Sequence, residues 1–250
     1  MPSALPLDPA TFIPRFDAAA RRAGFGGEKF GEIHGFDLNA YTKPARPDAP
    51  RIYVSSGMHG DEPAPPWAVL RLVEDGFFDA RAAWWICPVL NPTGLARGTR
   101  ENFAGIDLNR DYKHPVTAEI GAHVAWLERQ PDFDAAFCLH EDFEAAGFYL
   151  YELNPANRPT LADVALAGAG RHCPIENAAV IDGRDADAPG IIRPVSDPLL
   201  RDRWPEAIYL RHGRTTLGYT FESPTRLPLE QRVAAHCAAL HDALARLLAS

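Results

Sequence analysis

Two residue types that readily bind zinc occur three positions apart in the first third of the chain. His59 and Glu62 belong to the sequence GMHGDE, which follows an apolar run predicted to form a strand and precedes a proline suited to a first helical turn. A histidine nitrogen and a carboxylate oxygen in one tight loop can bind the same zinc ion. The alternative is a polar turn in which Glu62 interacts favourably with a helix N-terminus.

A third candidate ligand ends a later apolar run. His140 closes the sequence FDAAFCLH, which is predicted to form a buried strand. A catalytic zinc ion needs three protein ligands and an open position for water, and His59, Glu62 and His140 would supply those ligands. Both histidines are predicted at strand ends, so they can converge on one point. The alternative is a histidine that packs at the edge of the core.

Arginines and a carboxylate concentrate between these ligands, in the sequences NPTGLARGTR and GIDLNRDY. Arg97, Arg100 and Arg110 present planar forks that bind carboxylates through two hydrogen bonds. One of them can therefore bind a substrate carboxylate while another stabilises an oxyanion. Asp107 can hold a zinc-binding histidine in its tautomer. The alternative is a charged loop that is simply solvated.

A late carboxylate completes the set of candidate catalytic groups. Glu222 lies in YTFESP, at the end of a β-rich stretch. Water activated by zinc needs a general base, and partial burial raises the pKa of such a carboxylate toward neutrality. A surface glutamate at a strand end is the alternative.

Three other catalytic motifs are missing from the sequence. The serine nucleophile pattern G-x-S-x-G, the phosphate loop G-x-x-x-x-G-K-[ST] and the zinc motif H-E-x-x-H do not occur, because Glu144 stands where the last motif needs its second histidine after His140. The sequence therefore gives little support to serine hydrolases and nucleoside triphosphatases.

The ordered pieces HGDE, NPTGLARGTR, DLNR, CLH and TFE resemble the zinc metallocarboxypeptidase family. The resemblance spans residues 59–222 and implies a three-layer α/β/α sandwich around a mixed, mostly parallel sheet, with one bound zinc ion. It implies zinc on His59, Glu62 and His140, with Glu222 as general base and acid. It further implies that Arg100, with Arg97 beside it, polarises the scissile carbonyl group. Asn109 and Arg110 would bind the terminal carboxylate of the substrate, and Asp107 would hold His59 in place.

The activity implied by the resemblance is hydrolysis of an amide bond next to a free carboxylate, with a short peptide as the favoured substrate. The chain is shorter than the digestive carboxypeptidases, and Tyr209 is spaced too closely to Glu222 to match their mobile-loop tyrosine. Its compact size is similar to the bacterial murein peptide amidases, which act in the cytoplasm on peptides from cell-wall recycling.

Two alternatives to peptide hydrolysis stay open. The related aspartoacylase and succinylglutamate desuccinylase group shares the HxxE, D-x-N-R and late-glutamate elements and cleaves N-acyl amino acids. A catalytically silent zinc- or peptide-binding protein is the other alternative, although binding alone requires neither Glu222 nor Arg100.

Helical and strand patterns alternate along the chain and favour an α/β fold with a mostly parallel sheet. The predicted helices are Pro9–Ala23, Pro63–Glu74, Val116–Arg129, Leu161–His172 and Leu229–Leu248. The predicted β segments are a hairpin at Glu28–Tyr41, strands at Arg51–Ser56, Ala82–Leu90, Phe133–His140 and Phe148–Glu152, and strand-like pieces within Ile208–Phe221.

Composition limits the class of protein. The 250 residues are 46% hydrophobic and 23% charged, which is typical of a soluble globular domain, and we expect one domain over residues 1–250. The net charge of −8 argues against nucleic-acid and anionic-membrane partners. Scattered cysteines, no apolar run of membrane-spanning length and no signal peptide predict a cytoplasmic protein. The oligomeric state is left open.

One segment is predicted to be a functional or mobile loop. Ile181–Pro205 is dense in proline, glycine and charged residues, and it precedes the sequence that carries Glu222. Its charges of both signs predict a wall of the substrate site that favours a polar, charged or zwitterionic substrate side chain over an apolar one. The charged residues on which this rests are Asp185, Asp187, Arg193, Arg201 and Arg203.

Overall fold

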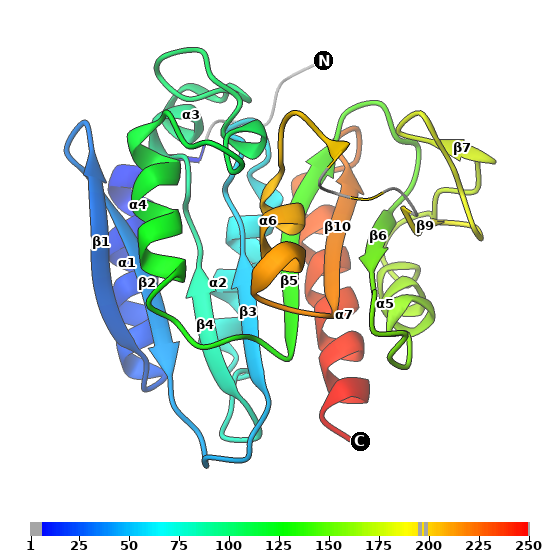
Figure 1. Cartoon of the computed structure of the whole chain (residues 1–250), viewed down its shortest axis with the longest axis horizontal. Helices are drawn as coiled ribbons and strands as arrows, with labels where there is room; N and C mark the ends of the chain where they lie inside the picture. The colour runs from blue at the N-terminus through cyan, green and yellow to red at the C-terminus, as the bar shows by residue number, and fades with distance from the viewer. Residues whose placement is uncertain (1–6, 195–196, 198–199, 250) are drawn as a thin grey trace.

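The structure is a computed structural model, and it describes residues 7–194, 197 and 200–249. Its central feature is an eight-stranded mixed sheet in the order β1-β2-β4-β3-β5-β10-β6-β9 (Figure 1). In chain order these strands are β1 (Gly26–Ile33), β2 (Phe36–Lys43), β3 (Arg51–Ser55), β4 (Ala83–Cys87), β5 (Ala135–Asp142), β6 (Tyr149–Leu153), β9 (Ile191–Ile192) and β10 (Gly218–Pro224). A separate two-stranded hairpin consists of β7 (Val180–Ile181) and β8 (Arg184–Asp185).

Parallel pairing dominates the middle of the sheet. Strands β4, β3, β5 and β10 run parallel to one another, whereas the β1–β2, β2–β4 and β10–β6 pairs are antiparallel. The carboxyl ends of β3, β5 and β10 consequently meet at one edge of the sheet. This edge is where ligands bind in open α/β sheets.

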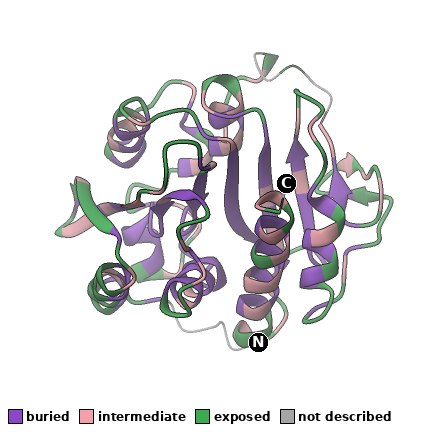
Figure 2. Ribbon diagram, turned by 90° about the horizontal axis from the view of Figure 1, so that it is seen from below, coloured by how far each residue is buried: buried purple, intermediate pink, exposed green. Residues whose placement is uncertain are grey.

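Helices cover both faces of the sheet. One face packs against α1 (Pro9–Arg22), α2 (Ala64–Glu74), α5 (Ala162–Ala169) and α7 (Leu229–Leu247). The other face packs against α4 (Ala118–Leu127) and α6 (Glu206–Gly213), which lie in front of the sheet in Figure 1. The predicted α/β/α sandwich is therefore confirmed, and Figure 2 shows the buried strands between exposed outer helix surfaces.

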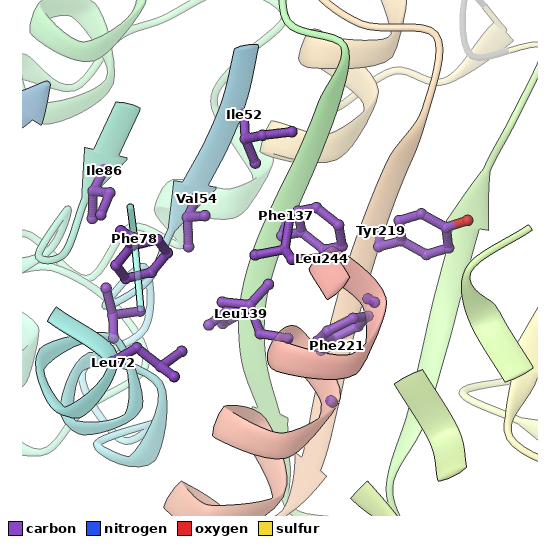
Figure 3. Close-up of a cluster of buried hydrophobic side chains, with 14 of the residues drawn as sticks. Ile52, Val54, Leu72, Phe78, Ile86, Phe137, Leu139, Tyr219, Phe221 and Leu244 are labelled. Carbon is purple, nitrogen blue, oxygen red and sulfur yellow. The ribbon is translucent and has the colours of Figure 1, made fainter. Parts of the chain in front are cut away.

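The central strands are almost continuous apolar runs in the sequence because the core buries both of their faces. Phe137 and Leu139 on β5 and Phe221 on β10 contact the layer that contains α7, where Leu244 is buried (Figure 3). Ala136 and Cys138 alternate with them and pack in the other core. A strand buried on both faces cannot show a polar alternation. Full burial of one such phenylalanine stabilises the fold by about 1.5–3 kcal/mol.

The long connection between β4 and α4 lies at the carboxyl edge of the sheet. It contains α3 (Pro92–Arg97) and the 3-10 turn η1 (Leu108–Arg110). Asn91 caps α3 by accepting a hydrogen bond from the Gly94 amide at 2.9 Å. Asp107 caps η1 in the same way through the Asn109 amide.

The strand expected within Ile208–Phe221 is confined to the end of this stretch. Its last residues belong to β10, whereas its first half belongs to α6, a helix that the sequence did not predict. The backbone amide of Glu206 donates to Asn109 Oδ1 at 2.9 Å, which satisfies a free amide at the start of this helix. Ile208 and Leu210 then turn into the core. A tertiary contact thus decides the local structure.

The predicted loop at Ile181–Pro205 also contains more regular structure than expected. Its start overlaps β7, and it includes β8 and the edge strand β9. Ile181 and Ile192 are buried in a small cluster with Tyr149, which anchors the hairpin to β6. Residues 195, 196, 198 and 199 of this segment lie outside the described part of the chain.

Candidate metal centre and active site

The three predicted zinc ligands converge at the carboxyl edge of the sheet. His59 Nδ1 lies 2.6 Å from Glu62 Oε1, and His140 Nδ1 lies 3.0 Å from Glu62 Oε2. One ligand atom from each of the three side chains lies within 4.8 Å of the others, and all three side chains are buried. Two imidazole nitrogens and a carboxylate in this arrangement fit the donor set of a catalytic zinc site.

Neighbouring strands explain this convergence. The loop with His59 and Glu62 follows β3, and His140 lies near the end of β5, which pairs with β3 in parallel. Within the loop, Gly60 has no room for a side chain, because a Cβ atom there would lie 1.9 Å from the carbonyl carbon of Gly94. Glycine at this position lets the loop pack closely against α3.

His59, Glu62 and His140 are together called the metal-binding cluster below. Asp107 and Arg100 lie beside it. His59 Nε2 is 3.2 Å from Asp107 Oδ1, so the ring can donate to Asp107 through Nε2 and keep Nδ1 free as a ligand. Arg100 Nε donates to Asp107 Oδ2 at 3.1 Å, and its Nη1 lies 3.6 Å from Glu62 Oε1. The Arg100 side chain is 35% exposed, so it reaches both the cluster and solvent.

The pKa shifts in the cluster reflect burial and the close contact of one carboxylate with two histidines, and burial is the main cause that lowers the pKa of His140. Burial lowers the pKa of His59, but the Glu62 carboxylate and the hydrogen bonds to Asp107 and Glu62 outweigh it and raise the pKa to about 9. Burial raises the pKa of Glu62, yet the two neighbouring histidines bring it below its ordinary value. A site with this electrostatic character attracts a positive charge, whether a proton or a metal cation.

Glu222 faces the same cavity as the metal-binding cluster. It pairs in register with His140 across the β5–β10 ladder. Burial raises the pKa of Glu222 well above its ordinary value, and the charges of Glu62, Asp142 and Asp182 raise it further, against an opposing effect of Arg100. A carboxyl group with a raised pKa can both accept and release a proton near neutral pH.

The remaining predicted residues divide into those at the cavity and those outside it. A cavity of about 550 Å³ is lined by Arg100, Asn109 and Arg110 together with the metal-binding cluster. Arg97 does not line this cavity, and its Nη1 donates to the Phe103 carbonyl at 3.1 Å. The structure therefore does not place Arg97 with the other predicted substrate-binding residues.

Several cavity residues were not predicted from the sequence. Tyr149 and Tyr151 lie on one face of β6, and Tyr149 donates to Asp142 at 2.9 Å while Tyr151 donates to Asp182. Two tyrosines at alternate positions of a strand were the signal that could have indicated them. Arg184 is a further lining residue. Tyr209, whose spacing to Glu222 does not match the mobile-loop tyrosine, packs against Tyr112 and does not line the cavity.

The wall predicted from Ile181–Pro205 is present with a partly different set of charges, because only Arg201 and Arg203 of the predicted residues belong to it. Asp182, Arg184, Arg201 and Arg203 line the cavity. Asp185 and Asp187 are exposed and Arg193 pairs with Glu152, and none of these three lines the cavity.

A buried polar network lies directly behind the metal-binding cluster. Glu141 Oε2 accepts a hydrogen bond from the Ala64 amide at 2.8 Å, and Oε1 accepts from Ser223 Oγ at 3.0 Å. Arg232 on α7 forms an ion pair with the same carboxylate. Burial raises the pKa of Glu141 to about 7 against the opposing effect of Arg232, and the surrounding donors favour the ionised form. Ser223 Oγ is also 3.0 Å from His236 Nε2.

The family comparison gives one match. The model of the succinylglutamate desuccinylase/aspartoacylase catalytic domain matches residues 48–167. This range includes the three candidate metal ligands, Asp107 and the arginine-rich connection, whereas Glu222 lies outside it. The comparison with curated proteins yields no match.

Solved structures share the fold over nearly the whole chain. A protein from Shewanella amazonensis, provisionally assigned as a metallopeptidase, is 26% identical with a TM-score of 0.82, and the match covers 95% of this chain and 92% of that one. A similarly assigned protein from Shewanella baltica is 25% identical with a TM-score of 0.80, covering 96% and 91%.

A more distant structure shows the same fold. A metallo-carboxypeptidase from Burkholderia cenocepacia is 19% identical with a TM-score of 0.68, covering 95% of this chain and 68% of that one. Together with the catalytic-domain match, these structures support a metal-dependent hydrolase. These similarities support a zinc carboxypeptidase-like family.

Proposed function

We propose that this protein is a zinc-dependent hydrolase that cleaves an amide bond next to a free carboxylate. The observation that carries the proposal is the placement of His59, Glu62, His140 and Glu222 around one cavity. Zinc bound to the first three residues would act as a Lewis acid and lower the pKa of a water molecule toward about 7.

Charge balance supports a divalent cation in this cluster. With neutral histidines, the carboxylates of Glu62 and Asp107 and the guanidinium of Arg100 leave one negative charge, and Glu222 adds a second when it is ionised, as a general base must be. Removing such charges from water without a partner is costly. A divalent cation compensates for both charges, whereas protonation of His59 alone compensates for one.

Glu222 is the proposed general base and acid. Its carboxylate accepts a proton from the attacking water and later donates it to the leaving amine, for which its raised pKa is suited. Arg100, which reaches into the cavity beside Glu62, stabilises negative charge on the carbonyl oxygen.

Asn109 and Arg110 are the proposed clamp for the substrate carboxylate. Asn109 Oδ1 is already engaged by the Glu206 amide, which fixes the side chain and leaves its Nδ2 group to donate. Arg110 lines the cavity with a guanidinium fork that matches a carboxylate. The charged lining from Asp182, Arg184 and Arg201 favours a substrate with a polar or charged side chain.

Short peptides are the first candidate substrates, since the more similar solved structures carry metallopeptidase assignments. Murein-derived peptides, with their charged side chains, suit the lining described above. N-acyl amino acids are the second candidate, favoured by the match to the desuccinylase and aspartoacylase catalytic domain.

We also propose a cytoplasmic location, which the four unpaired cysteines support. Among the described residues, no helix is long and apolar enough to span a membrane.

A matched substrate panel tests the activity. Zinc-loaded protein is assayed with murein tripeptide, ordinary short peptides and N-acyl amino acids, each as the free acid and as the carboxamide. We expect cleavage of a free acid in at least one class and much weaker cleavage of its carboxamide. Loss of activity with a chelator and recovery with zinc would support the metal centre. A zinc-binding protein that cleaves none of these substrates would contradict the proposed function.

A further inference from the structure

The proposed mechanism gives no role to Glu141. It follows His140 on β5, but the alternation of the strand turns its side chain away from His140. The residue is only 4% exposed, and its carboxylate contacts three other elements of the fold.

The contact with α2 is the one that bears on the metal-binding cluster. This helix starts two residues after Glu62, and its N-cap residue, Pro63, has no side chain that can cap it. Its next two residues after Ala64 are prolines, which have no amide hydrogen. The Ala64 amide is therefore a backbone donor that the first turn has to satisfy, and Glu141 Oε2 accepts it at 2.8 Å.

This hydrogen bond joins two segments that the sheet does not join. The loop carrying His59 and Glu62 lies beyond the end of β3, outside the described ladder between β3 and β5. The bond from Ala64 to Glu141 connects the end of this loop with the residue after His140. The position of Glu62 relative to His140 is thus tied to one buried carboxylate.

The other two contacts hold that carboxylate in place. Ser223, the residue after Glu222, pairs in register with Glu141 and donates to Oε1 at 3.0 Å. Arg232, which is 3% exposed, supplies the opposite charge and also donates to the Leu227 carbonyl. A buried carboxylate with three donors is fixed in orientation.

We propose that Glu141 is a positioning residue that sets the separation of Glu62 from His140 by accepting the Ala64 amide, and that it thereby determines metal affinity. The inference rests on the proposed metal site. Groups that orient metal ligands typically change metal affinity by about 10–100-fold when they are replaced.

Two double variants separate positioning from the stability of the ion pair. Both E141Q/R232M and E141L/R232M remove the buried charges, but only glutamine keeps a carbonyl oxygen that can accept the Ala64 amide and an amide group that can donate to Ser223. Replacement of a buried ion pair by neutral groups is often tolerated. Glu152→Gln is the matched control, because Glu152 on β6 is also a buried carboxylate paired with an arginine, Arg193. It is 3% exposed and does not line the cavity.

The measurement is the zinc dissociation constant from competition with a chromophoric chelator, with thermal unfolding of the zinc-free proteins as the test of folding. We expect E141Q/R232M and E152Q to bind zinc within about threefold of the wild type, and E141L/R232M to bind at least about 10-fold more weakly. Equal zinc affinities in the two double variants would overturn the proposal. A double variant that does not fold also counts against it, because Glu141 would then support the whole core rather than the site. A wild-type protein that binds no zinc would instead contradict the proposed function.

Discussion

Acidification should destabilise this protein through a buried histidine that does not line the candidate active site. His123 on α4 is fully buried, with Nε2 3.0 Å from Tyr53 Oη and Nδ1 2.7 Å from Tyr112 Oη. Tyr53 donates its hydroxyl hydrogen to Glu206 at 2.7 Å, so it accepts from His123 Nε2–H. Nδ1 then accepts the hydroxyl hydrogen of Tyr112, so both nitrogens of the neutral ring and both tyrosine hydroxyls have hydrogen-bond partners.

The magnitude follows from the pKa of this histidine. Burial lowers the pKa of His123 from 6.5 to about 3. The folded state therefore disfavours the proton that the unfolded chain binds below pH 6.5, and stability falls as pH decreases from about 6.5 toward 3. From these two pKa values, the free energy of unfolding should fall by about 2 kcal/mol between pH 8 and pH 5 because of His123 alone.

The assay is urea unfolding at pH 8 and pH 5, with a chelator present so that metal release does not contribute. His123→Gln cannot titrate, and the comparison at pH 8 gives the cost of the substitution itself. The variant should lose about 2 kcal/mol less than the wild type on going to pH 5. A second buried histidine, His236, has a pKa lowered to about 3 by burial and contributes equally to both proteins. Identical pH dependence in variant and wild type would refute this reasoning.

The remaining predictions concern the site. Glu222→Gln should retain zinc binding while turnover falls by about 10²–10⁴-fold, and near-wild-type kcat would exclude Glu222 as the base. Asp107→Asn should weaken zinc binding by about 10–100-fold in a chelator competition, because His59 loses its charged partner, and unchanged affinity would contradict that bracing role. Arg110→Lys should reduce the preference for free acid over carboxamide substrate, measured as a ratio of kcat/KM, and a constant ratio would argue against the clamp. Peptides ending in charged residues should be cleaved with higher kcat/KM than those ending in Phe or Leu, and the reverse order would contradict the charged lining.

The convergence of the metal-binding cluster was predictable because it depends on strand ends. His59 follows β3 and His140 ends the apolar part of β5, and these two strands are parallel neighbours. In a parallel sheet the carboxyl ends of neighbouring strands share one edge, whatever the chain does between them. Glu222 was accessible to the same reasoning, since β10 also pairs with β5 in parallel.

The positions of Tyr149 and Arg97 could not be predicted from the sequence, because they depend on strand register and on the path of the chain after α3. Tyr149 reaches the cavity because β6 runs antiparallel to β10 with Tyr149 opposite Glu222, and no local pattern specifies that register. Arg97 was expected beside Arg100, but Gly98 ends α3 in the left-handed conformation with φ of 65°, and the chain reverses between the two arginines. Closeness in sequence therefore did not bring their side chains together.

Glu141 illustrates a further limit of sequence reasoning. Next to His140, its carboxylate could be taken for a second catalytic acid, yet strand alternation directs it to the opposite face. Its partners Ala64, Ser223 and Arg232 come from segments that only the fold brings together. A motif can indicate which atoms could bind a metal, but the groups that hold those atoms at the required separation come from tertiary structure. The metal affinity of this site should therefore depend on residues that no local motif contains.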